Sequence, residues 1–159
     1  MTGANREGIH FNIIGTNYKL TNIQAAVGLG QLENIDKLLK KRISLANNYK
    51  KLIKNINKIN LPKVLNPKPD CQHSFQTYVV FIEKRDKVMA EMRKKGIEVQ
   101  IGSYSLHMHN AFNSNPKVEI IGDLSNSRWC FENALALPLY NDLTFDLQEY
   151  IVNELKSCL

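Results

Sequence analysis

The clearest helix start in this chain lies in the stretch Gly15-Thr16-Asn17-Tyr18-Lys19-Leu20-Thr21-Asn22-Ile23-Gln24-Ala25-Ala26-Val27-Gly28-Leu29-Gly30-Gln31-Leu32-Glu33. Thr21 and Gln24 fit a capping box, in which the threonine hydroxyl accepts a backbone hydrogen bond and the glutamine side chain reaches back to the threonine amide. Apolar residues then recur at steps of three and four as far as Leu39. This spacing predicts a helix of about five turns, from Thr21 to roughly Lys40.

A second helical pattern follows directly. Its apolar and aromatic members are Leu45, Tyr49, Leu52, Ile53 and Ile56. Whether this pattern continues the first helix or bends away near residues 42–44 stays open. Lysines interleave with the apolar residues and so fall mainly on the outward side of the helices. They are Lys37, Lys40, Lys41, Lys50, Lys51 and Lys54.

Two strands and a helix are predicted beyond this region. Prolines predict an irregular connection over residues 57–72. The β-branched and aromatic residues of 74–82 predict a buried strand. A helix over residues 85–95 follows and ends at Gly96, and the alternation of residues 97–101 is typical of a second strand.

The last third of the chain is predicted to be a loop followed by two helices. Residues 102–122 are rich in glycine and asparagine and predict the loop. The first helix is capped by Ser125 or Ser127 and runs through Leu135, and the second is capped by Thr144. The side chains expected to face inward on this last helix and on the helix over residues 85–95 are Val88, Met89, Met92, Leu147, Ile151 and Leu155.

This order of elements predicts an α+β fold, with helices on one side of a small sheet. Two strands are few, and a two-stranded sheet is marginally stable by itself. The sequence therefore indicates that part of the surface packs against a partner.

Composition narrows the class of protein. The chain has 159 residues, 43% of them apolar, which is enough for one domain with a buried core. No apolar stretch approaches the roughly 20 residues of a membrane span, and the first residues lack the apolar core of a secretory signal. The three cysteines form no C-x-x-C pair, so neither a disulfide framework nor a zinc site is expected. We expect a reduced, cytoplasmic protein without a membrane partner.

The net charge of +6 fits a nucleic-acid partner, an anionic ligand or a solvated surface. The lysines are spread along helix faces, and the sequence has no arginine-rich cluster or recognition-helix pattern. This distribution favours a solvated surface, and no nucleic-acid partner is expected.

The residues by themselves name no reaction. The common nucleophile, phosphate-loop and zinc-protease motifs are absent. His107 and His109 stand two residues apart, but no carboxylate or thiolate accompanies them at metal-ligand spacing, so no metal site is expected. Cys71 lies in no nucleophile motif, and His73 fits a hydrogen-bonded structural role.

The stretch from Gly15 to Glu33 closely resembles the G-x-N-Y-R-[LM]-[TS]-[ND]-[IL]-Q-A-A-x-G-x-x-Q-L motif of the pyridoxal-phosphate-dependent nucleotide-sugar aminotransferases of the DegT/StrS type. The resemblance continues in order over residues 6–159. The later segments that carry it are His73-Ser74-Phe75-Gln76-Thr77-Tyr78-Val79-Val80, the piece from Lys95-Gly96-Ile97 to Leu106-His107, and Leu135-Ala136-Leu137-Pro138-Leu139-Tyr140 with Leu143-Thr144.

The resemblance implies the C-terminal part of a fold type I enzyme. Residues 1–20 would be an arm that carries the cofactor-phosphate asparagine, residues 21–56 an interdomain helical segment, and residues 57–159 a small α+β domain with an antiparallel sheet covered by helices. The family's Schiff-base lysine and the aspartate that pairs with the pyridine nitrogen belong upstream of these segments. The chain is therefore expected to be an excised piece or a truncated gene product.

The resemblance also implies site residues. Asn17 would bind the phosphate of pyridoxal phosphate in the other subunit of a homodimer, and Lys19 would add positive charge where the family usually has arginine. Tyr104 and His107 would contact the sugar of the substrate. Gly102-Ser103-Tyr104-Ser105 departs from the family's H-Y-x-P, so the particular sugar is not implied. A turn asparagine, a packed tyrosine and a surface histidine remain as alternatives.

The function implied is transfer of an amino group to a keto-sugar nucleotide, in surface polysaccharide or amino-sugar biosynthesis. The alternatives are a sugar dehydratase of the same superfamily, which uses a histidine in place of the lysine, and a non-catalytic interaction module held together by the helices of residues 21–56. Because it lacks the lysine, the chain alone is expected to be inactive. It is also expected to self-associate through apolar surface around residues 23–39.

Overall fold

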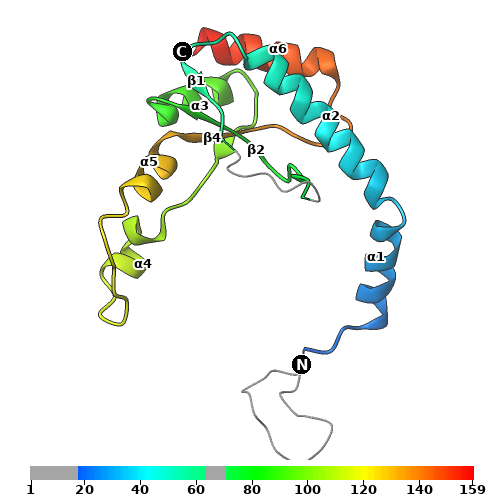
Figure 1. Cartoon of the computed structure of the whole chain (residues 1–159), viewed down its shortest axis with the longest axis horizontal. Coiled ribbons are helices and arrows are strands. Elements are labelled where there is room, and N and C mark those ends of the chain that lie inside the picture. The colour runs from blue at the N-terminus through cyan, green and yellow to red at the C-terminus, as the bar shows by residue number, and fades with distance from the viewer. Residues whose placement is uncertain (1–17, 64–70) are drawn as a thin grey trace, which may run out of the picture. The chain divides into compact units, whose positions relative to one another are not determined.

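The computed structural model describes residues 18–63 and 71–159 (Figure 1). The chain divides into two compact units, residues 1–37 and 38–159. The helices and strands in chain order are α1 (Asn22–Leu32), α2 (Ile35–Ile53), β1 (Ile59–Asn60), β2 (Tyr78–Ile82), α3 (Arg85–Lys94), β3 (Gln100–Ile101), the short 3-10 helix η1 (Leu106–Met108), α4 (Asn110–Asn113), α5 (Ser125–Asn133), β4 (Ala134–Leu137) and α6 (Phe145–Ser157).

Helix α1 begins as predicted but ends early. The amide of Gln24 donates to Thr21 Oγ1 at 3.2 Å, and the amide of Thr21 donates to Gln24 Oε1 at 2.9 Å, which confirms the capping box. The predicted continuous helix as far as Lys40 is wrong, because the chain turns at Glu33 and Asn34 before α2 starts. The two glycines of α1 lower its helix propensity, and a tight bond from the Asn34 amide to the carbonyl of Gln31 closes the turn.

Helix α2 contains most of the second helical pattern, without a bend at residues 42–44. Its buried side chains are Leu45, Ala46, Tyr49 and Ile53. The six lysines named from the sequence are all exposed, which confirms that they occupy the solvated side. In contrast, α1 buries none of its residues, so self-association through its apolar side chains stays a prediction.

The sheet has four antiparallel strands in the order β1-β2-β4-β3. Strand β4 was not predicted: the sequence pattern carried the preceding helix through Leu135, whereas α5 ends at Asn133. All four residues of β4 are buried, so no alternation marks the strand, and alanine and leucine favour helices intrinsically. Its pairing with β2 and β3 decides its conformation instead.

Strand β2 is shorter than predicted because it begins at Tyr78 rather than at Ser74. Phe75 has a φ of 48°, and its amide donates to His73 Nδ1 at 2.9 Å, which gives His73 the hydrogen-bonded role expected of it. The carbonyls of Phe75 and Gln76 accept from the guanidinium of Arg42 at 3.0 and 3.1 Å. These bonds hold the segment against α2 instead of in the sheet.

Helix α3 ends as the sequence predicts. Gly96 has a φ of 76°, a conformation that glycine adopts without a steric penalty. The amide of Ile97 then donates back to the carbonyl of Met92 at 3.1 Å. Val88 and Met92 are buried, and Met89 is partly buried against the same core. Strand β3 keeps only Gln100 and Ile101 of the strand predicted over residues 97–101.

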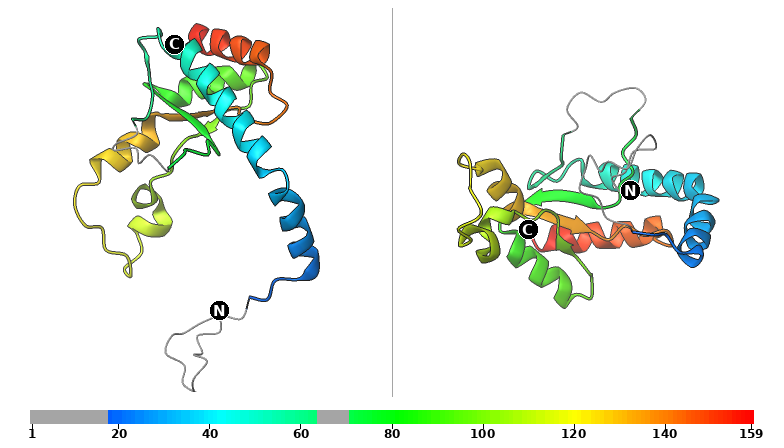
Figure 2. Two further views of the ribbon diagram at one scale, coloured as in Figure 1. Left: turned by 45° about the vertical axis from the view of Figure 1, so that its right-hand side comes forward. Right: turned by 90° about the horizontal axis from the view of Figure 1, so that it is seen from below.

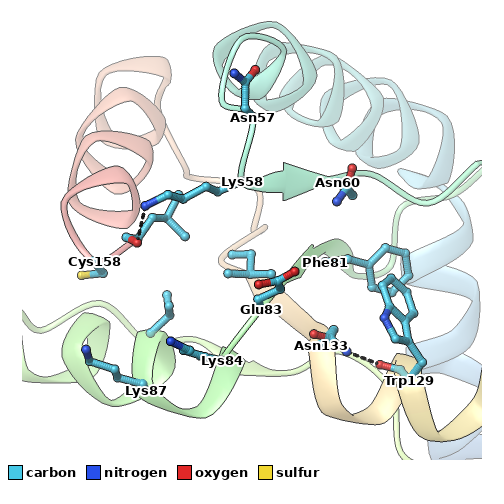
Figure 3. Close-up of a pocket in the computed structure, with 13 residues that line it drawn as sticks. Asn57, Lys58, Asn60, Phe81, Glu83, Lys84, Lys87, Trp129, Asn133 and Cys158 are labelled. Atoms are coloured by element: carbon cyan, nitrogen blue, oxygen red, sulfur yellow. Dashed lines mark hydrogen bonds between the residues drawn. The ribbon is translucent and has the colours of Figure 1, made fainter.

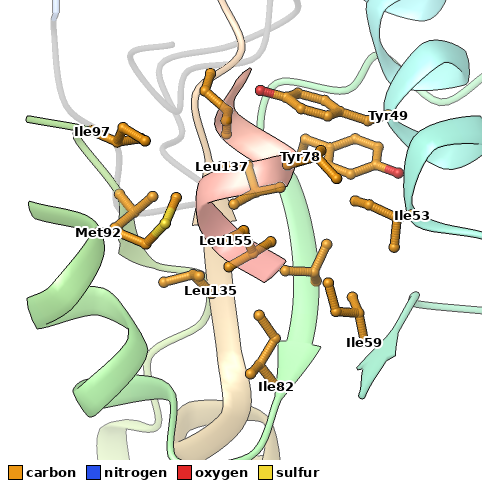
Figure 4. Close-up of a cluster of buried hydrophobic side chains, with 14 of the residues drawn as sticks. Tyr49, Ile53, Ile59, Tyr78, Ile82, Met92, Ile97, Leu135, Leu137 and Leu155 are labelled. Carbon is orange, nitrogen blue, oxygen red and sulfur yellow. The ribbon is translucent and has the colours of Figure 1, made fainter. Parts of the chain in front are cut away.

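One hydrophobic core joins the sheet to α2, α3 and α6 (Figure 4). Alternate residues of β2 face it, and the rings of Tyr49 and Tyr78 lie 4.9 Å apart between α2 and the sheet. Helix α6 lies beside α2, as Figures 1 and 2 show and as the bonds of Gln148 to Leu45 and Asn48 require. The arrangement confirms the predicted α+β class, with a small antiparallel sheet covered by helices.

Helix α6 is capped as predicted, and Ile151 and Leu155 face inward as expected, whereas Leu147 does not. The amide of Leu147 donates to Thr144 Oγ1 at 3.2 Å. Leu147, expected to face inward, is 44% exposed, and Gln148 is buried in its place. The Gln148 amide donates to the carbonyl of Leu45 at 3.0 Å and accepts from Asn48 Nδ2 at 2.9 Å. A glutamine with both ends paired can be buried at low cost, which an apolar periodicity does not anticipate.

Alkaline pH should destabilise this core. Burial raises the pKa of Tyr78 to about 12 and raises the pKa of Tyr49 as well. Between pH 10 and 12 the unfolded chain, with ordinary tyrosine pKa values, loses protons that the folded chain keeps. The free energy of unfolding should therefore be unaffected below pH 10 and fall above it, by about 1 kcal/mol per pH unit and tyrosine. Urea unfolding at a series of pH values measures this slope, and the slope should decrease in Tyr78→Phe. A wild-type stability that stays constant across this range would contradict the prediction.

Candidate functional site

The candidate site is the loop that follows β3, which carries Tyr104 and His107. The loop leaves the sheet at Gly102, whose amide donates to the carbonyl of Ala134 at 2.9 Å. A Cβ at Gly102 would lie 2.9 Å from Val79 Cγ1 and 3.0 Å from Ala134 Cβ. Only glycine lets the backbone approach β2 and β4 this closely, so the start of the site loop is fixed by packing.

Replacement of Gly102 by alanine should therefore shift this loop. We expect Gly102→Ala to lower the free energy of unfolding by about 1–3 kcal/mol through overpacking, and to change the chemical shifts of His107. Urea unfolding and two-dimensional NMR measure the two effects. The matched control is Gly28→Ala, because a Cβ at Gly28 meets no atom within 4 Å, and this variant should be neutral or stabilising. Equal stabilities of the two variants would contradict the packing argument.

Ser105 connects the loop to α5. Its side chain is 1% exposed, and its Oγ lies 2.8 Å from His107 Nδ1 and 2.9 Å from Ser127 Oγ. The Ser105 hydroxyl can donate to Nδ1 or accept from it, according to the tautomer of the imidazole. The two serines thus orient the imidazole.

The second nitrogen of this imidazole has no protein partner among the described residues. His107 Nε2 is buried and makes no hydrogen bond to residues 18–63 or 71–159. A buried polar atom without a partner costs roughly 1–3 kcal/mol. The imidazole is therefore anchored on one side by Ser105 and unsatisfied on the other.

An aromatic cluster forms the exposed side of the same loop. The ring of Tyr104 is centred 6.1 Å from both His109 and Phe131, and the latter two rings meet edge to face at 5.4 Å. Tyr104 is 62% exposed, so its hydroxyl is available to a ligand while one side of its ring is supported. Both roles considered for Tyr104, packing against these rings and contact with a ligand, are compatible with this geometry.

Buried Arg85 fixes this cluster to the sheet. Its guanidinium donates to the carbonyl of Phe131 at 2.7 Å and to that of Ala134 at 3.1 Å, and it lies 5.6 Å from the centre of the Phe131 ring. Asp86 Oδ1 forms an ion pair with Arg85 Nε at 2.7 Å. The wall of the site is therefore held by a side chain at the start of α3.

The sequence did not predict that Ser105, Ser127 and Phe131 belong to this site. Ser127 was predicted only as a possible cap of the helix that starts near residue 125. The structure gives it a different role, because its hydroxyl contacts Ser105 while Asp123 Oδ1 accepts from the amide of Ser125 at the start of α5. Phe131 stands in a segment with no motif of its own, and Ser105, although it lies between Tyr104 and His107, was given no role. The proximity of Phe131 to the site depends on the pairing of β3 with β4, which no local pattern displays.

The predicted cofactor residues belong to the other unit. Asn17 lies outside the described residues. Lys19 is exposed and stands two residues before Thr21, the N-cap of α1. Lys19 is thus in the unit of residues 1–37, and Tyr104 and His107 are in the unit of residues 38–159.

Residues 18–63 and 71–159 contain neither a cluster of metal ligands nor a membrane-spanning helix. No three histidine, cysteine or acidic side chains gather there as metal ligands would. No helix in that part of the chain is both long and apolar enough to cross a bilayer. Cys71 is exposed and has a free thiol.

Known proteins resemble the chain over nearly its whole length. The chain is 27% identical over 153 residues to dTDP-4-amino-4,6-dideoxy-D-glucose transaminase from Shigella dysenteriae, which covers 93% of this chain and 40% of that protein. It is 32% identical over 141 residues to GDP-perosamine synthase from Caulobacter vibrioides, which covers 84% of this chain and 36% of that one. The chain therefore spans about two fifths of the length of these relatives.

A solved structure has the same fold. The sugar aminotransferase Spr1654 from Streptococcus pneumoniae, described as putative and determined in a PLP form, superposes with a TM-score of 0.73 at 22% identity, over 99% of this chain and 41% of that one. A family model described as the DegT/DnrJ/EryC1/StrS aminotransferase family matches residues 2–156. With nearly all of its residues matched, the protein belongs to the DegT/DnrJ/EryC1/StrS aminotransferase family.

Proposed function

We propose that this chain is the C-terminal part of a pyridoxal-phosphate-dependent aminotransferase that transfers an amino group to a keto-sugar nucleotide. The observation that carries the proposal is the family match over residues 2–156. Relatives with 27% and 32% identity are named as a transaminase and a perosamine synthase that use dTDP- and GDP-linked sugars. These names favour an aminotransferase over a sugar dehydratase and over a non-catalytic module.

The residues near the start of α1 fit a phosphate group. The side chain of Lys19 is exposed, and within the described residues it has no ion-pair partner. It stands just before a helix N-terminus, where the backbone amides also favour an anion. The hydroxyl of Thr21 is already used in the capping box, so Lys19, with Asn17 before it, would hold the phosphate of the cofactor.

Pyridoxal phosphate, when bound, supplies the aldehyde that takes up the amino group and the ring that accepts electron density beside it. The residues of this chain would bind the cofactor and orient it. Lys19 provides positive charge, although it lacks the two-pronged geometry of the family's usual arginine. Asn17 would act across the interface of a homodimer.

We propose that the complete enzyme works in the cytoplasm, in the biosynthesis of surface polysaccharide or amino sugars.

The loop after β3 would bind the sugar. His107 would donate from Nε2 to a sugar hydroxyl or phosphate oxygen, with Ser105 holding Nδ1 at 2.8 Å. Tyr104 would present its exposed ring and hydroxyl to the same substrate. Both residues position the substrate, and neither has to move a proton in the reaction.

Variants of the complete enzyme test this division of roles. Asn17→Ala should weaken pyridoxal phosphate binding about tenfold or more, the loss expected for one charge-assisted bond, in an absorbance titration. His107→Ala should instead raise KM for the sugar nucleotide and leave the affinity for the cofactor unchanged. Unchanged cofactor affinity in Asn17→Ala would remove that assignment. A substrate complex with Tyr104 and His107 remote from the sugar would remove the other.

The identity of the complete enzyme can be checked in the gene. A lysine in a K-x-x-x-x-G-E-G-G segment upstream of Met1 is expected for an aminotransferase. A histidine at that position would indicate a dehydratase instead, and the function proposed here would then be wrong.

A further inference from the structure

A second surface feature of the unit of residues 38–159 is a cavity of about 460 Å³, which we call the Trp129 cavity. It lies between β1, the end of β2, the start of α3, α5 and the end of α6 (Figure 3). Its lining residues include Lys58, Phe81, Lys84, Lys87, Trp129 and Asn133. A volume in this range accommodates a small organic ligand. None of the residues of the Tyr104 and His107 site lines it.

One wall of the Trp129 cavity is positively charged. Lys84 and Lys87 stand at the start of α3, and within the described part of the chain neither side chain has a hydrogen-bond or ion-pair partner. Lys58 lines the cavity as well, but its Nζ already donates at 2.6 Å to an oxygen of the terminal carboxylate of Leu159, whose negative charge offsets that of the lysine. Glu83 is the acidic side chain among the described lining residues. The side chains of the wall therefore carry a net positive charge, available mainly at Lys84 and Lys87.

The backbone beneath this wall adds to the attraction for an anion. Lys84 is the N-cap of α3, and no side chain caps the helix there. The first amides of a ten-residue helix therefore lack a side-chain acceptor at the same end of the cavity. Lys84 also has a φ of 55°, a left-handed conformation that costs a non-glycine residue about 1–2 kcal/mol. Such strained residues are concentrated at functional sites.

The other wall is aromatic. The rings of Phe81 and Trp129 lie 4.8 Å apart at an angle of 51°, and Figure 3 shows this pair on the side of the cavity away from Lys87. Trp129 is 47% exposed, so part of its indole is open to a stacking partner. Asn133 fixes the helix turn beneath it, because its Nδ2 donates to the carbonyl of Trp129 at 2.9 Å.

We propose that the Trp129 cavity binds a nucleoside diphosphate. Its base would stack on Trp129 and its phosphates would meet Lys84, Lys87 and the start of α3. An aromatic platform together with unpaired lysines is the combination that recognises a planar ring carrying phosphate. Ligand binding on one side of α5 would also act on the helix that holds Ser127 and Phe131 of the candidate sugar site.

The sequence provides its own probe, because Trp129 is its one tryptophan. Titration of the chain with uridine diphosphate at low salt should change tryptophan fluorescence saturably, with half-saturation below about 1 mM. Uridine alone and pyrophosphate alone should each bind at least about tenfold more weakly, because each lacks one half of the recognised structure. The assay contains no cofactor and no amino donor, so its result is separate from that of the proposed aminotransferase.

Paired charge variants complete the test. Lys84→Gln with Lys87→Gln should raise the dissociation constant at least about tenfold. The matched control, Lys40→Gln with Lys51→Gln, removes two exposed α2 lysines that do not line the cavity and should change it less than about twofold. Circular dichroism verifies that both variants fold, and calorimetry repeats the titration by heat. Absence of saturable binding by both methods, an equal loss in both variants, or equal affinity for pyrophosphate and uridine diphosphate would overturn the proposal.

Discussion

Purified by itself, the 159-residue chain is expected to transfer no amino group to a keto-sugar nucleotide, even when pyridoxal phosphate is added. The reaction needs a neutral lysine amine that bonds covalently to the cofactor, held beside the cofactor ring. Every lysine in the described part of the chain is exposed, and an exposed lysine is almost fully protonated at neutral pH. The contacts proposed for Asn17 and Lys19 would bind one end of the cofactor and leave its ring in water.

The test uses the chain with excess pyridoxal phosphate. Borohydride reduction followed by mass spectrometry should find low, scattered modification of many lysines, and a coupled assay with an amino donor and a keto-sugar nucleotide should find no product. The complete enzyme from the same gene is the positive control. Stoichiometric trapping at one lysine together with amino transfer would contradict the prediction, and would require an active site within these residues.

The parts of the fold that follow from neighbouring residues could be predicted from the sequence. The capping box of Thr21 and Gln24, the Thr144 cap and the left-handed Gly96 each depend on contacts within a few residues. The same holds for the exposed lysines of α2, whose position follows from helical periodicity. Because these features depend on residues that are close together in the sequence, a local sequence pattern is enough to predict them.

The parts that follow from distant contacts could not be predicted in this way. The segment 134–137 is a strand because β2 and β3 flank it, although its composition favours a helix. Gln148 is buried because Leu45 and Asn48, a hundred residues earlier in the chain, satisfy its amide. In both cases the contacts that decide the structure come from residues far away in the sequence, so no pattern near residues 134–137 or Gln148 reveals them.

The residues of the candidate site also fall into those that a sequence motif identifies and those that only the fold brings together. Tyr104 and His107 could be named because a family motif includes their segment. Ser105, Ser127 and Phe131, which orient and support them, come together through the sheet and through Arg85. A pattern read along the chain finds the residues proposed to contact a ligand more easily than those that hold them in place.

Leu135→Ala is expected to be among the most destabilising single truncations in the unit of residues 38–159. Leu135 is fully buried in β4, which pairs on both of its edges. Removal of its side chain loses apolar burial and leaves a cavity that a strand held on two sides cannot close. We expect the free energy of unfolding to fall by about 3–5 kcal/mol, a large part of the 5–15 kcal/mol typical of a domain. Urea unfolding followed by circular dichroism measures the loss.

Leu147→Ala is the matched control, since it removes the same atoms from a residue that the sequence pattern also places inward. Leu147 is 44% exposed at the start of α6, so its truncation leaves no closed cavity, and alanine is the better helix former. The expected change is within about 0.5 kcal/mol. Similar losses in the two variants would mean that Leu147 packs in the core, as the periodicity of the sequence predicts. A small loss in Leu135→Ala would mean that residues 134–137 are not the centre of the sheet. A wide gap between the two variants is expected, because burial depends on what packs against a residue from elsewhere in the chain.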